Sequence, residues 1–304
     1  MNEARPLFSV VVPTFQRPDG LTRCLEALAA LDFPRERFEV VVVDDGSAQP
    51  PREIVARFAA VLDVRLIEEP NAGPAVARNT GVAAARGEYL AFTDDDCRPD
   101  PHWLRALEEV VARYPGSAIG GRVENALGDG LYSTASQLLI DFLYEYYNVD
   151  EGTGRFFITS NLAFPTDAFR AIGGFDASFP LAAAEDRDAC DRWREAGHSM
   201  VYADDAVVHH AHALRLRSFC RQHYTYGRGA YYLHRARSRR GEAPLRVEPL
   251  DFYTRLVTYP LKRIAAPRSI ALAAVTALSQ AVYISGYLRE RLRNRAPSSS
   301  SARA

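Results

Sequence analysis

The chain has few cysteines, and their placement argues against two classes of protein. Among 304 residues there are only four, Cys24, Cys97, Cys190 and Cys220, and no two of them form a Cys-x-x-Cys pair. This spacing argues against a disulfide framework and against a structural zinc site. It is typical of a protein kept in a reducing compartment, so we expect a cytoplasmic location.

Two nucleotide-binding signatures are also missing. The first apolar run, residues 8–12, is not followed by Gly-x-Gly-x-x-Gly, and the chain has no Walker A sequence. We therefore expect neither a dinucleotide-binding Rossmann site nor a P-loop. Residues 1–6 lead directly into the first run without the pattern of a signal peptide, which agrees with the expected location.

Acidic residues are scarce near the C-terminal end. Residues 211–304 contain 18 Lys and Arg against 4 Asp and Glu, although the whole chain has a net charge of −1. Such a segment predicts contact with something anionic, such as a membrane, a nucleic acid or a phosphorylated acceptor. A solvated basic surface is the alternative.

Apolar strand patterns alternate with helical patterns through the first 125 residues. The expected strands are 8–12, 39–43, 64–67, 89–92 and 118–123, and the expected helices are 22–31, 52–61, 74–85 and 101–113. Continuous Val-rich strands separated by helices predict an α/β fold, with a mainly parallel sheet covered by helices on both faces. In such sheets ligands bind beyond the carboxyl ends of the strands.

The pattern becomes less regular farther along the chain. We expect helices over 132–148, 166–172 and 185–196, and strands over 156–164, 200–203 and 206–208. Residues 241–249 are typical of a linker, followed by a helical region and a Ser-rich tail from Pro297 that we expect to be disordered. The expected organisation is an α/β domain over 1–230 and a basic helical extension over 231–304.

Three consecutive carboxylates, Asp94, Asp95 and Asp96, follow the strand expected at 89–92. They repel one another and cost desolvation when buried, whereas a divalent cation would neutralise them. Mg²⁺ and Mn²⁺ take oxygen ligands of this kind and share them with phosphate, so a bound metal could hold a diphosphate. The structural alternative is that Asp96 or Asp100 caps the helix expected near Pro101.

Two other polar clusters are placed where a ligand could bind. Asp44 and Asp45 end the strand at 39–43, where a carboxylate can accept hydrogen bonds from a ribose or a base. Gly73 precedes a helix whose N-terminus favours anions, and Arg78 lies one turn into that helix. An Asp-Gly turn and an Arg–Asp salt bridge are the structural alternatives.

Two further clusters lie near residue 200. Glu185 and Asp186 begin a helix, where they complement the helix dipole or include a general base. Arg187, Arg192 and Arg194 of that helix are expected to face solvent. His209-His210-Ala211-His212 follows an apolar pair and could provide a metal ligand or a diphosphate contact.

Taken in order, these motifs resemble those of the inverting family 2 glycosyltransferases, which have the GT-A fold. The resemblance covers roughly Phe8 to Tyr226. Its segments are Ser9-Val10-Val11-Val12-Pro13-Thr14-Phe15, Val43-Asp44-Asp45-Gly46-Ser47, Asn71-Ala72-Gly73-Pro74 with Ala77-Arg78-Asn79, Gly87 to Asp96, Asn161-Leu162-Ala163-Phe164, Gly173-Gly174-Phe175-Asp176 and Glu185-Asp186-Arg187-Asp188.

The resemblance implies a Rossmann-like GT-A domain and a metal-dependent enzyme. It would move a sugar, with inversion, from a UDP-, GDP- or dTDP-sugar to an acceptor hydroxyl in the synthesis of a surface glycan or glycolipid. Asp186 would be the catalytic base with Glu185 beside it, and Asp96 with His210 or His212 would hold Mn²⁺ or Mg²⁺. The residues expected to bind the nucleotide sugar are Pro13, Thr14, Asp44, Asp45, Gly46, Ser47, Gly73, Arg78, Asp94 and Asp95.

The acceptor stays open, as either a glycan or a lipid-linked molecule, because residues 125–155 match no specificity signature. A nucleotidyltransferase is one alternative, but residues 15–20 make a poor triphosphate loop. A nucleic-acid-binding protein is another, through Phe219 and the tyrosines at 224, 226, 231 and 232. That reading leaves the carboxylates at 94–96 unexplained, so we expect no nucleic-acid partner. A scaffold with an inactive site is a third alternative.

One uncharged stretch, Ser269 to Leu288, is long enough to span a bilayer. Its Ala, Thr, Ser and Gln residues make insertion marginal. We favour an interfacial helix at the inner face of the cell membrane, over packing on the domain and over spanning.

Overall fold

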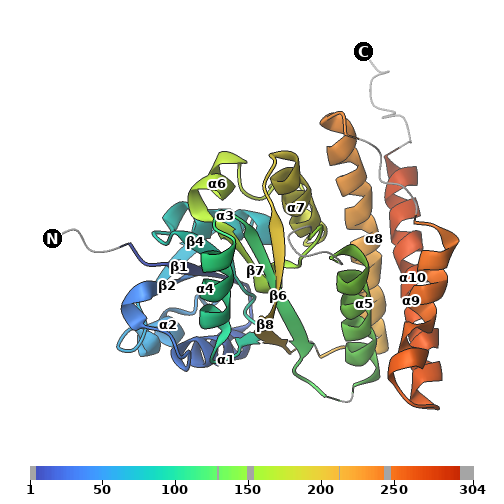
Figure 1. Cartoon of the computed structure of the whole chain (residues 1–304), viewed down its shortest axis with the longest axis horizontal. Coiled ribbons are helices and arrows are strands. Elements are labelled where there is room, and N and C mark those ends of the chain that lie inside the picture. The colour runs from blue at the N-terminus through green and yellow to red at the C-terminus, as the bar shows by residue number, and fades with distance from the viewer. Residues whose placement is uncertain (1–4, 129, 149–153, 212, 243–247, 295–304) are drawn as a thin grey trace.

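The computed structural model describes residues 5–128, 130–148, 154–211, 213–242 and 248–294, and an eight-stranded sheet lies at its centre (Figure 1). The strands lie in the order β3-β2-β1-β4-β7-β6-β8-β5. Four pairs are parallel (β1–β2, β2–β3, β1–β4 and β6–β8), and β7 and β5 pair antiparallel with their neighbours. The strands are β1 Phe8–Thr14, β2 Phe38–Asp45, β3 Val64–Glu69, β4 Tyr89–Phe92, β5 Cys97–Pro99, β6 Ala118–Asn125, β7 Leu162–Pro165 and β8 Met200–His210.

Helices cover both faces of this sheet. One apolar cluster packs α1, α2 and α4 against one face, and a second packs α3, α6 and α7 against the other. Helix α1 shows why, since its buried Leu21, Leu25 and Leu28 recur at helical spacing. The helices are α1 Pro18–Ala29, α2 Arg52–Phe58, α3 Pro74–Ala84, α4 Trp103–Arg113, α5 Leu131–Tyr147, α6 Thr166–Ala171, α7 Glu185–Glu195, α8 Leu216–Arg239, α9 Leu250–Arg263 and α10 Arg268–Arg293. The expected α/β fold with a C-terminal helical extension is confirmed.

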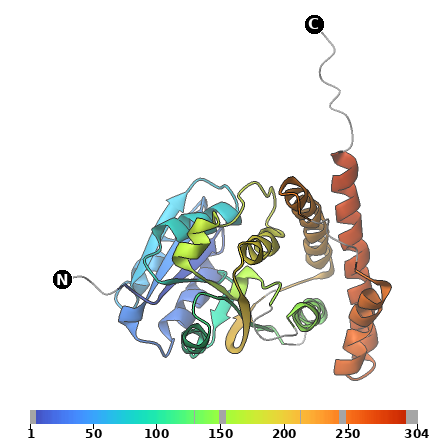
Figure 2. The same cartoon turned by 45° about the horizontal axis from the view of Figure 1, so that its top comes forward.

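Helices α5, α8, α9 and α10 form a separate group beside the sheet (Figures 1 and 2). Two glycines let α8 and α10 approach closely. A Cβ atom at Gly227 would lie 1.8 Å from the carbonyl oxygen of Tyr283, and one at Gly286 would lie 2.2 Å from that of Tyr224. Arg228 of α8 also pairs with the buried Glu290 of α10 at 2.5 Å. One face of α10 is therefore fixed against α8.

Three sequence-based element predictions are wrong in part. The strand expected at 156–164 is limited to β7, because Phe156 and Phe157 turn toward the rings of Tyr144 and Tyr202 and do not join the sheet. The two strands expected after residue 200 form the single strand β8, with a register shift opposite Gly121 and Arg122. Strand β5 was missed because three residues are too few to show a pattern.

The expected domain boundary at residue 230 falls inside the continuous helix α8, and the division into two domains stays a prediction. The Ser-rich tail from Pro297 lies outside the described residues. Within the described residues, α10 is the one helix that is long and apolar enough to cross a membrane by length and composition.

Candidate active site

The carboxyl ends of β2, β1 and β4 meet at one edge of the sheet. Thr14 at the end of β1 is in register with Asp44 of β2, and β4 pairs with β1 on its other side. The turn after β4 carries Asp94 to Asp96, and the hydroxyl of Thr14 donates a hydrogen bond to Asp95 at 2.8 Å. These ends open into a cleft of about 1750 Å³. The expected convergence of strand ends is therefore observed.

The acidic turn after β4 is paired with two cationic or titratable side chains. Arg17 contacts Asp96 at 2.7 Å and Asp95 at 3.1 Å, and Nε2 of His210 lies 3.1 Å from Oδ1 of Asp96. Burial raises the pKa of Asp95 to about 6, against the opposing effect of Arg17. Burial alone would lower the pKa of His210, but the hydrogen bond and charge of Asp96 raise it.

The residues beside Asp96 fit a divalent cation. Ligand atoms of Asp96, Cys97 and His210 all lie within 4.8 Å of one another. A carboxylate and an imidazole are ordinary ligands of Mn²⁺, and the neighbouring carboxylates add negative charge. His212, the alternative histidine, lies outside the described residues.

Asp44 and Asp45 lie side by side but make different contacts. Asp45 accepts hydrogen bonds from the backbone N–H groups of Ala72 and Gly73, at 2.7 and 3.0 Å, and so holds the loop that enters α3. Asp44 accepts one bond from the N–H of Ser47 at 3.2 Å. Its other oxygen is buried, has no partner among the described residues and does not line the cleft.

Arg78 of α3 joins the two acidic parts of the site. Its side chain is buried, donating to Asp94 at 2.9 Å and to Glu185 at 3.0 Å, and the ring of Phe175 lies 5.8 Å away. Burial would lower the pKa of Arg78, but the charges of Asp94 and Glu185 raise it. A buried guanidinium between two carboxylates fixes the distance between the turn after β4 and the start of α7.

Helix α7 presents Glu185 and Asp186 at the mouth of the cleft. The preceding residue, Ala184, has a left-handed φ of 72°, which costs energy for a residue with a side chain and is a feature that clusters at functional sites. Asp186 is half-buried and accepts a hydrogen bond from the N–H of Arg187 at 2.8 Å. Burial and the neighbouring charge of Glu185 raise the pKa of Asp186.

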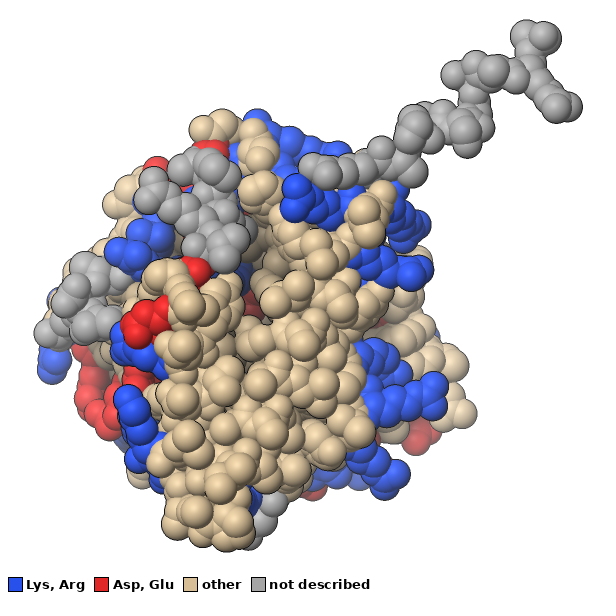
Figure 3. Space-filling view, turned by 90° about the vertical axis from the view of Figure 1, so that its right-hand side faces the viewer, with Lys and Arg blue, Asp and Glu red and all other residues tan. Residues whose placement is uncertain are grey.

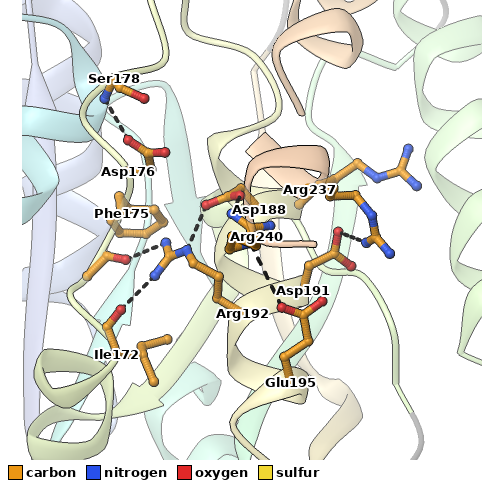
Figure 4. Close-up of polar contacts among 12 residues, drawn as sticks. Ile172, Phe175, Asp176, Ser178, Asp188, Asp191, Arg192, Glu195, Arg237 and Arg240 are labelled. Carbon is orange, nitrogen blue, oxygen red and sulfur yellow. Dashed lines mark hydrogen bonds and ion pairs between the residues drawn. The ribbon is translucent and has the colours of Figure 1, made fainter. Parts of the chain in front are cut away.

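The rest of α7 is anchored by ion pairs (Figure 4). Asp188 is fully buried and accepts bonds from Arg192 and from Arg240 of the α8 C-terminal end, each at 2.7 Å. Arg192 also donates to the carbonyl oxygens of Ile172 and Gly174, at 2.9 and 2.6 Å. Arg237 pairs with Asp191 in the same cluster. These contacts hold α7 in place behind the carboxylates that face the cleft.

The expectation that the arginines of α7 face solvent is wrong for two of them. Arg192 is bound in the ion-pair cluster, and the guanidinium of Arg187 lies 5.2 Å from the ring centroid of Phe156 and 5.6 Å from that of Tyr147. Only Arg194 is exposed. Helical spacing alone could not tell these positions apart, because the rings beside Arg187 and the carbonyl oxygens bound by Arg192 belong to other segments of the chain.

The cleft brings together most of the residues predicted from sequence. Of these, the following line it: Pro13, Thr14, Asp45, Gly73, Arg78, Asp94, Asp95, Asp96, Glu185, Asp186 and His210. Asp44, Gly46 and Ser47 do not; Ser47 instead accepts a hydrogen bond from the N–H of Gln16 at 2.8 Å. Arg17 was missed by the sequence analysis, although its place after β1 and before Pro18 puts it at a strand end.

The basic and aromatic segment that suggested nucleic-acid binding is largely packed. Phe219 of α8 is buried against the rings of Tyr132 and His223. The hydroxyl of Tyr232 donates to Glu290 at 3.1 Å. Side chains engaged in this way do not offer a row of rings to stacked bases, which speaks against that alternative.

Comparisons of sequence give one consistent family. The sequence model of Glycosyl transferase family 2 matches residues 9–173. The chain is 29% identical over 212 residues to "Glycosyltransferase AglE" of Haloferax volcanii, covering 69% of this chain and 68% of that protein. It is 32% identical over 232 residues to "Pre-mycofactocin glycosyltransferase" of Mycobacterium tuberculosis, covering 73% of this chain but only 46% of that protein.

Comparisons of structure agree on the fold. The mannosyltransferase PcManGT from Pyrobaculum calidifontis, solved with GDP-Man and Mn²⁺, superimposes with a TM-score of 0.66 at 22% identity. That match covers 95% of this chain and 88% of the other. Residues 1–349 of TarS from S. aureus, solved with UDP-GlcNAc, give 0.56 at 20% identity, covering 95% and 92%. At these identities the likeness concerns the fold alone.

Proposed function

Because this chain belongs to Glycosyl transferase family 2, we propose that it transfers a sugar from a nucleoside-diphosphate sugar to an acceptor hydroxyl with inversion at the anomeric carbon. The observation that carries this proposal is Arg78, which is buried between Asp94 of the acidic turn and Glu185 of α7. The contact holds a diphosphate-binding edge and a candidate base in one cleft. A scaffold protein would not need a buried arginine held between a half-buried and a buried carboxylate that line the same open space.

The donor would lie along the ends of β1, β2 and β4. Asp44, with a buried oxygen that lacks a partner among the described residues, suits a base N–H or a ribose hydroxyl. Asp94 would face the ribose and phosphates. Asp96 and His210 would hold Mn²⁺ or Mg²⁺, which supplies positive charge to the diphosphate as it leaves. The structural relatives solved with GDP-Man or UDP-GlcNAc support this class of donor.

Asp186 would act as the general base. The raised pKa of Asp186 makes its carboxylate a stronger base than that of an ordinary Asp, so it accepts a proton more readily. The acceptor oxygen attacks the anomeric carbon, the bond from that carbon to the β-phosphate oxygen breaks, and the hydroxyl proton passes to Asp186. One displacement without a covalent intermediate inverts the configuration. Arg78 positions Glu185 beside this base.

We place the enzyme in the cytoplasm with α10 against the inner face of the cell membrane, in the synthesis of a surface glycan or glycolipid. Large apolar side chains of α10 are exposed, among them Ile270, Ile284 and Leu292 at 62, 50 and 68%. Arginines flank them and would contact anionic lipid. The buried pair of Arg228 with Glu290 and the close packing on α8 favour an interfacial helix over a spanning one.

A screen of donor binding tests the proposal. UDP-, GDP- and dTDP-sugars are added to the folded protein with and without Mn²⁺, and thermal stabilisation and sugar release are measured. We expect one nucleotide class to stabilise the protein in a metal-dependent way and to be hydrolysed slowly. A folded protein that none of these donors stabilises or reacts with would contradict the proposal, and pyrophosphate release from a nucleoside triphosphate would favour the nucleotidyltransferase alternative.

A further inference from the structure

The cleft continues past Asp186 into the group of C-terminal helices, and its lining changes there. Around the acidic turn the lining is mostly charged and polar. Between α5, α9 and α10 apolar and aromatic side chains predominate over the few polar ones, Ser133, Ser136, Gln137 and Gln280; the former include Ile140, Leu143, Tyr147, Tyr253, Tyr283 and Ile284. The same open space is thus polar at one end and apolar at the other.

The apolar part begins directly beside the candidate base. Arg187 follows Asp186 in the chain, and its guanidinium lies over the ring of Tyr147. Tyr283 of α10 lines the same cleft as Arg187 and Tyr147. A molecule with a hydroxyl group at Asp186 would therefore extend its remaining part along Tyr147 and Tyr283.

The apolar part also reaches the outer face of α10. Ile284 both lines the cleft and is 50% exposed, and Ile270, Leu288 and Leu292 are exposed on the same helix. Figure 3 shows this side of the molecule as a broad face without charge, with Lys and Arg gathered toward its border. Ile284 thus connects the exposed apolar face of α10 with the cleft that holds the candidate base.

We propose that the acceptor is an amphipathic molecule, a sugar or alcohol attached to a hydrocarbon chain, and that the chain binds between α5, α9 and α10. This inference rests on the proposed function and narrows its acceptor. The acceptor hydroxyl forms the new bond to the anomeric carbon and gives its proton to Asp186. The nucleoside diphosphate leaves from the donor side.

A bare glycan fits this part of the cleft less well. Its hydroxyl groups would lose water against Ile140, Leu143 and Ile284, whose side chains offer no hydrogen bonds in return. Burying an unpaired hydroxyl costs roughly 1–3 kcal/mol in proteins. A hydrocarbon chain gains free energy in the same place, because apolar surface is removed from water.

Alkyl glucosides of increasing chain length test the inference. Binding of methyl, butyl and octyl β-glucoside to the full chain is measured by calorimetry below the micelle concentration. Each methylene that enters the cleft should strengthen binding by up to about fourfold, so octyl glucoside should bind at least about 100-fold tighter than methyl glucoside. Equal affinity of the three, or tighter binding of an oligosaccharide without a chain, would overturn the inference.

Two matched substitutions on α10 test where the hydrocarbon chain of the acceptor binds. Ile284→Asp changes a half-exposed residue that lines the cleft, and Ile270→Asp changes an exposed residue of the same helix outside it. We expect Ile284→Asp to weaken octyl glucoside binding at least about tenfold and Ile270→Asp to leave it unchanged. Equal effects of the two would overturn the placement.

Binding of UDP and GDP with Mn²⁺ separates this inference from the proposed function. It should be the same in the wild type and both variants, because neither residue is near the acidic turn. A wild type that binds no nucleotide would contradict the proposed function, whereas nucleotide binding without a dependence on chain length would overturn the acceptor inference alone.

Discussion

The two parts of the cleft differ in how they are built. The part at the strand ends is built from carboxylates held by hydrogen bonds and ion pairs. Asp45 accepts bonds from the loop before α3, and Arg78 pairs with both Asp94 and Glu185. The part between the C-terminal helices consists of apolar side chains on helix faces, with partial exposure. Polar contacts fix distances and directions, whereas apolar packing selects for size and hydrophobicity.

This difference indicates that the two parts of the cleft have separate roles, one in donor binding and chemistry and the other in acceptor binding. The strand-end part has the directional contacts that a diphosphate and a reacting centre need. Its β1, β2 and β4 ends belong to the segment matched by the family model, whereas Glu185, Asp186 and His210 lie beyond that segment. The helical part lies mostly beyond residue 173 and suits an acceptor of a type that other members need not share. Substitutions in the first part should change chemistry and donor binding, and those in the second should change acceptor and membrane binding.

The largest effect is expected for Asp186→Asn. Removing the base should lower kcat by ~10²–10⁴ while donor binding stays close to wild type. Asp176→Asn is the control, since the Asp176 side chain accepts a bond from the N–H of Ser178 and Asp176 does not line the cleft. Initial rates and nucleotide affinity of the three proteins give the comparison. Transfer by Asp186→Asn at the wild-type rate would show that the base lies elsewhere.

Arg78→Met should reduce the free energy of unfolding by about 3–5 kcal/mol, because two carboxylates are left without their buried partner. Arg52→Met breaks the exposed pair with Glu68 and should barely change stability, since exposed pairs contribute little. Denaturant unfolding of both variants measures the difference. Similar stabilities would mean that Arg78 is not a structural bridge between the acidic turn and α7.

Asp96→Ala should weaken Mn²⁺-dependent UDP or GDP binding by about tenfold or more, while the protein remains folded. Stability should change little, because the loss of the pair with Arg17 is offset by reduced repulsion among the carboxylates and Arg17 keeps Asp95 as a partner. Asp19→Ala is the matched control, because Asp19 is an exposed carboxylate that lines the same cleft without contacting Asp96. Nucleotide titrations with and without Mn²⁺ measure this affinity. Equal metal-dependent affinity in both variants would show that Asp96 is not a metal ligand.

Much of the strand-end part could be predicted from sequence, because it depends on short segments. The run 41–47 and the run 89–96 each combine an apolar strand with its terminal carboxylates, and the parallel pairing of their strands with β1 brings them together. What could not be predicted are contacts between distant segments. Arg17 on Asp96 and Arg240 on Asp188 join residues 79 and 52 positions apart.

The helical part could not be predicted from sequence for the same reason. Its apolar lining is assembled from α5, α8, α9 and α10, none of which has a distinctive motif. The uncharged sequence at 269–288 is compatible with an interfacial helix, a helix packed on the domain and a membrane-spanning helix. The close approach at Gly227 and Gly286, together with the pair of Arg228 and Glu290, shows which face of α10 is packed.

The pH dependence of activity should be set by the strand-end part. Burial and Glu185 favour the protonated form of Asp186, so the fraction of active base falls as pH decreases through its raised pKa. We expect kcat/KM to decline on the acid side at a pH well above the ordinary Asp value of about 4. A profile measured at saturating Mn²⁺ tests this, and activity that persists to about pH 4 would contradict it.

The smallest effect per residue is expected at the outer face of α10. Each of Arg289, Arg291 and Arg293 that contacts anionic lipid should contribute about 1 kcal/mol to vesicle binding, or roughly fivefold. Changing all three to Gln should reduce co-sedimentation with anionic liposomes at low salt, without altering donor binding. Absence of vesicle binding by the wild type at low salt would reject membrane contact and leave α10 as a packed helix.

The stereochemistry of transfer tests the central claim most directly. The wild type and Asp186→Asn are incubated with Mn²⁺, an α-linked nucleotide sugar selected by the binding screen and octyl glucoside as acceptor, and the product is examined by proton NMR. The account predicts a β-linked product from the wild type and a rate lower by ~10²–10⁴ from the variant. An α-linked product, or equal rates from the two proteins, would contradict a single displacement assisted by Asp186.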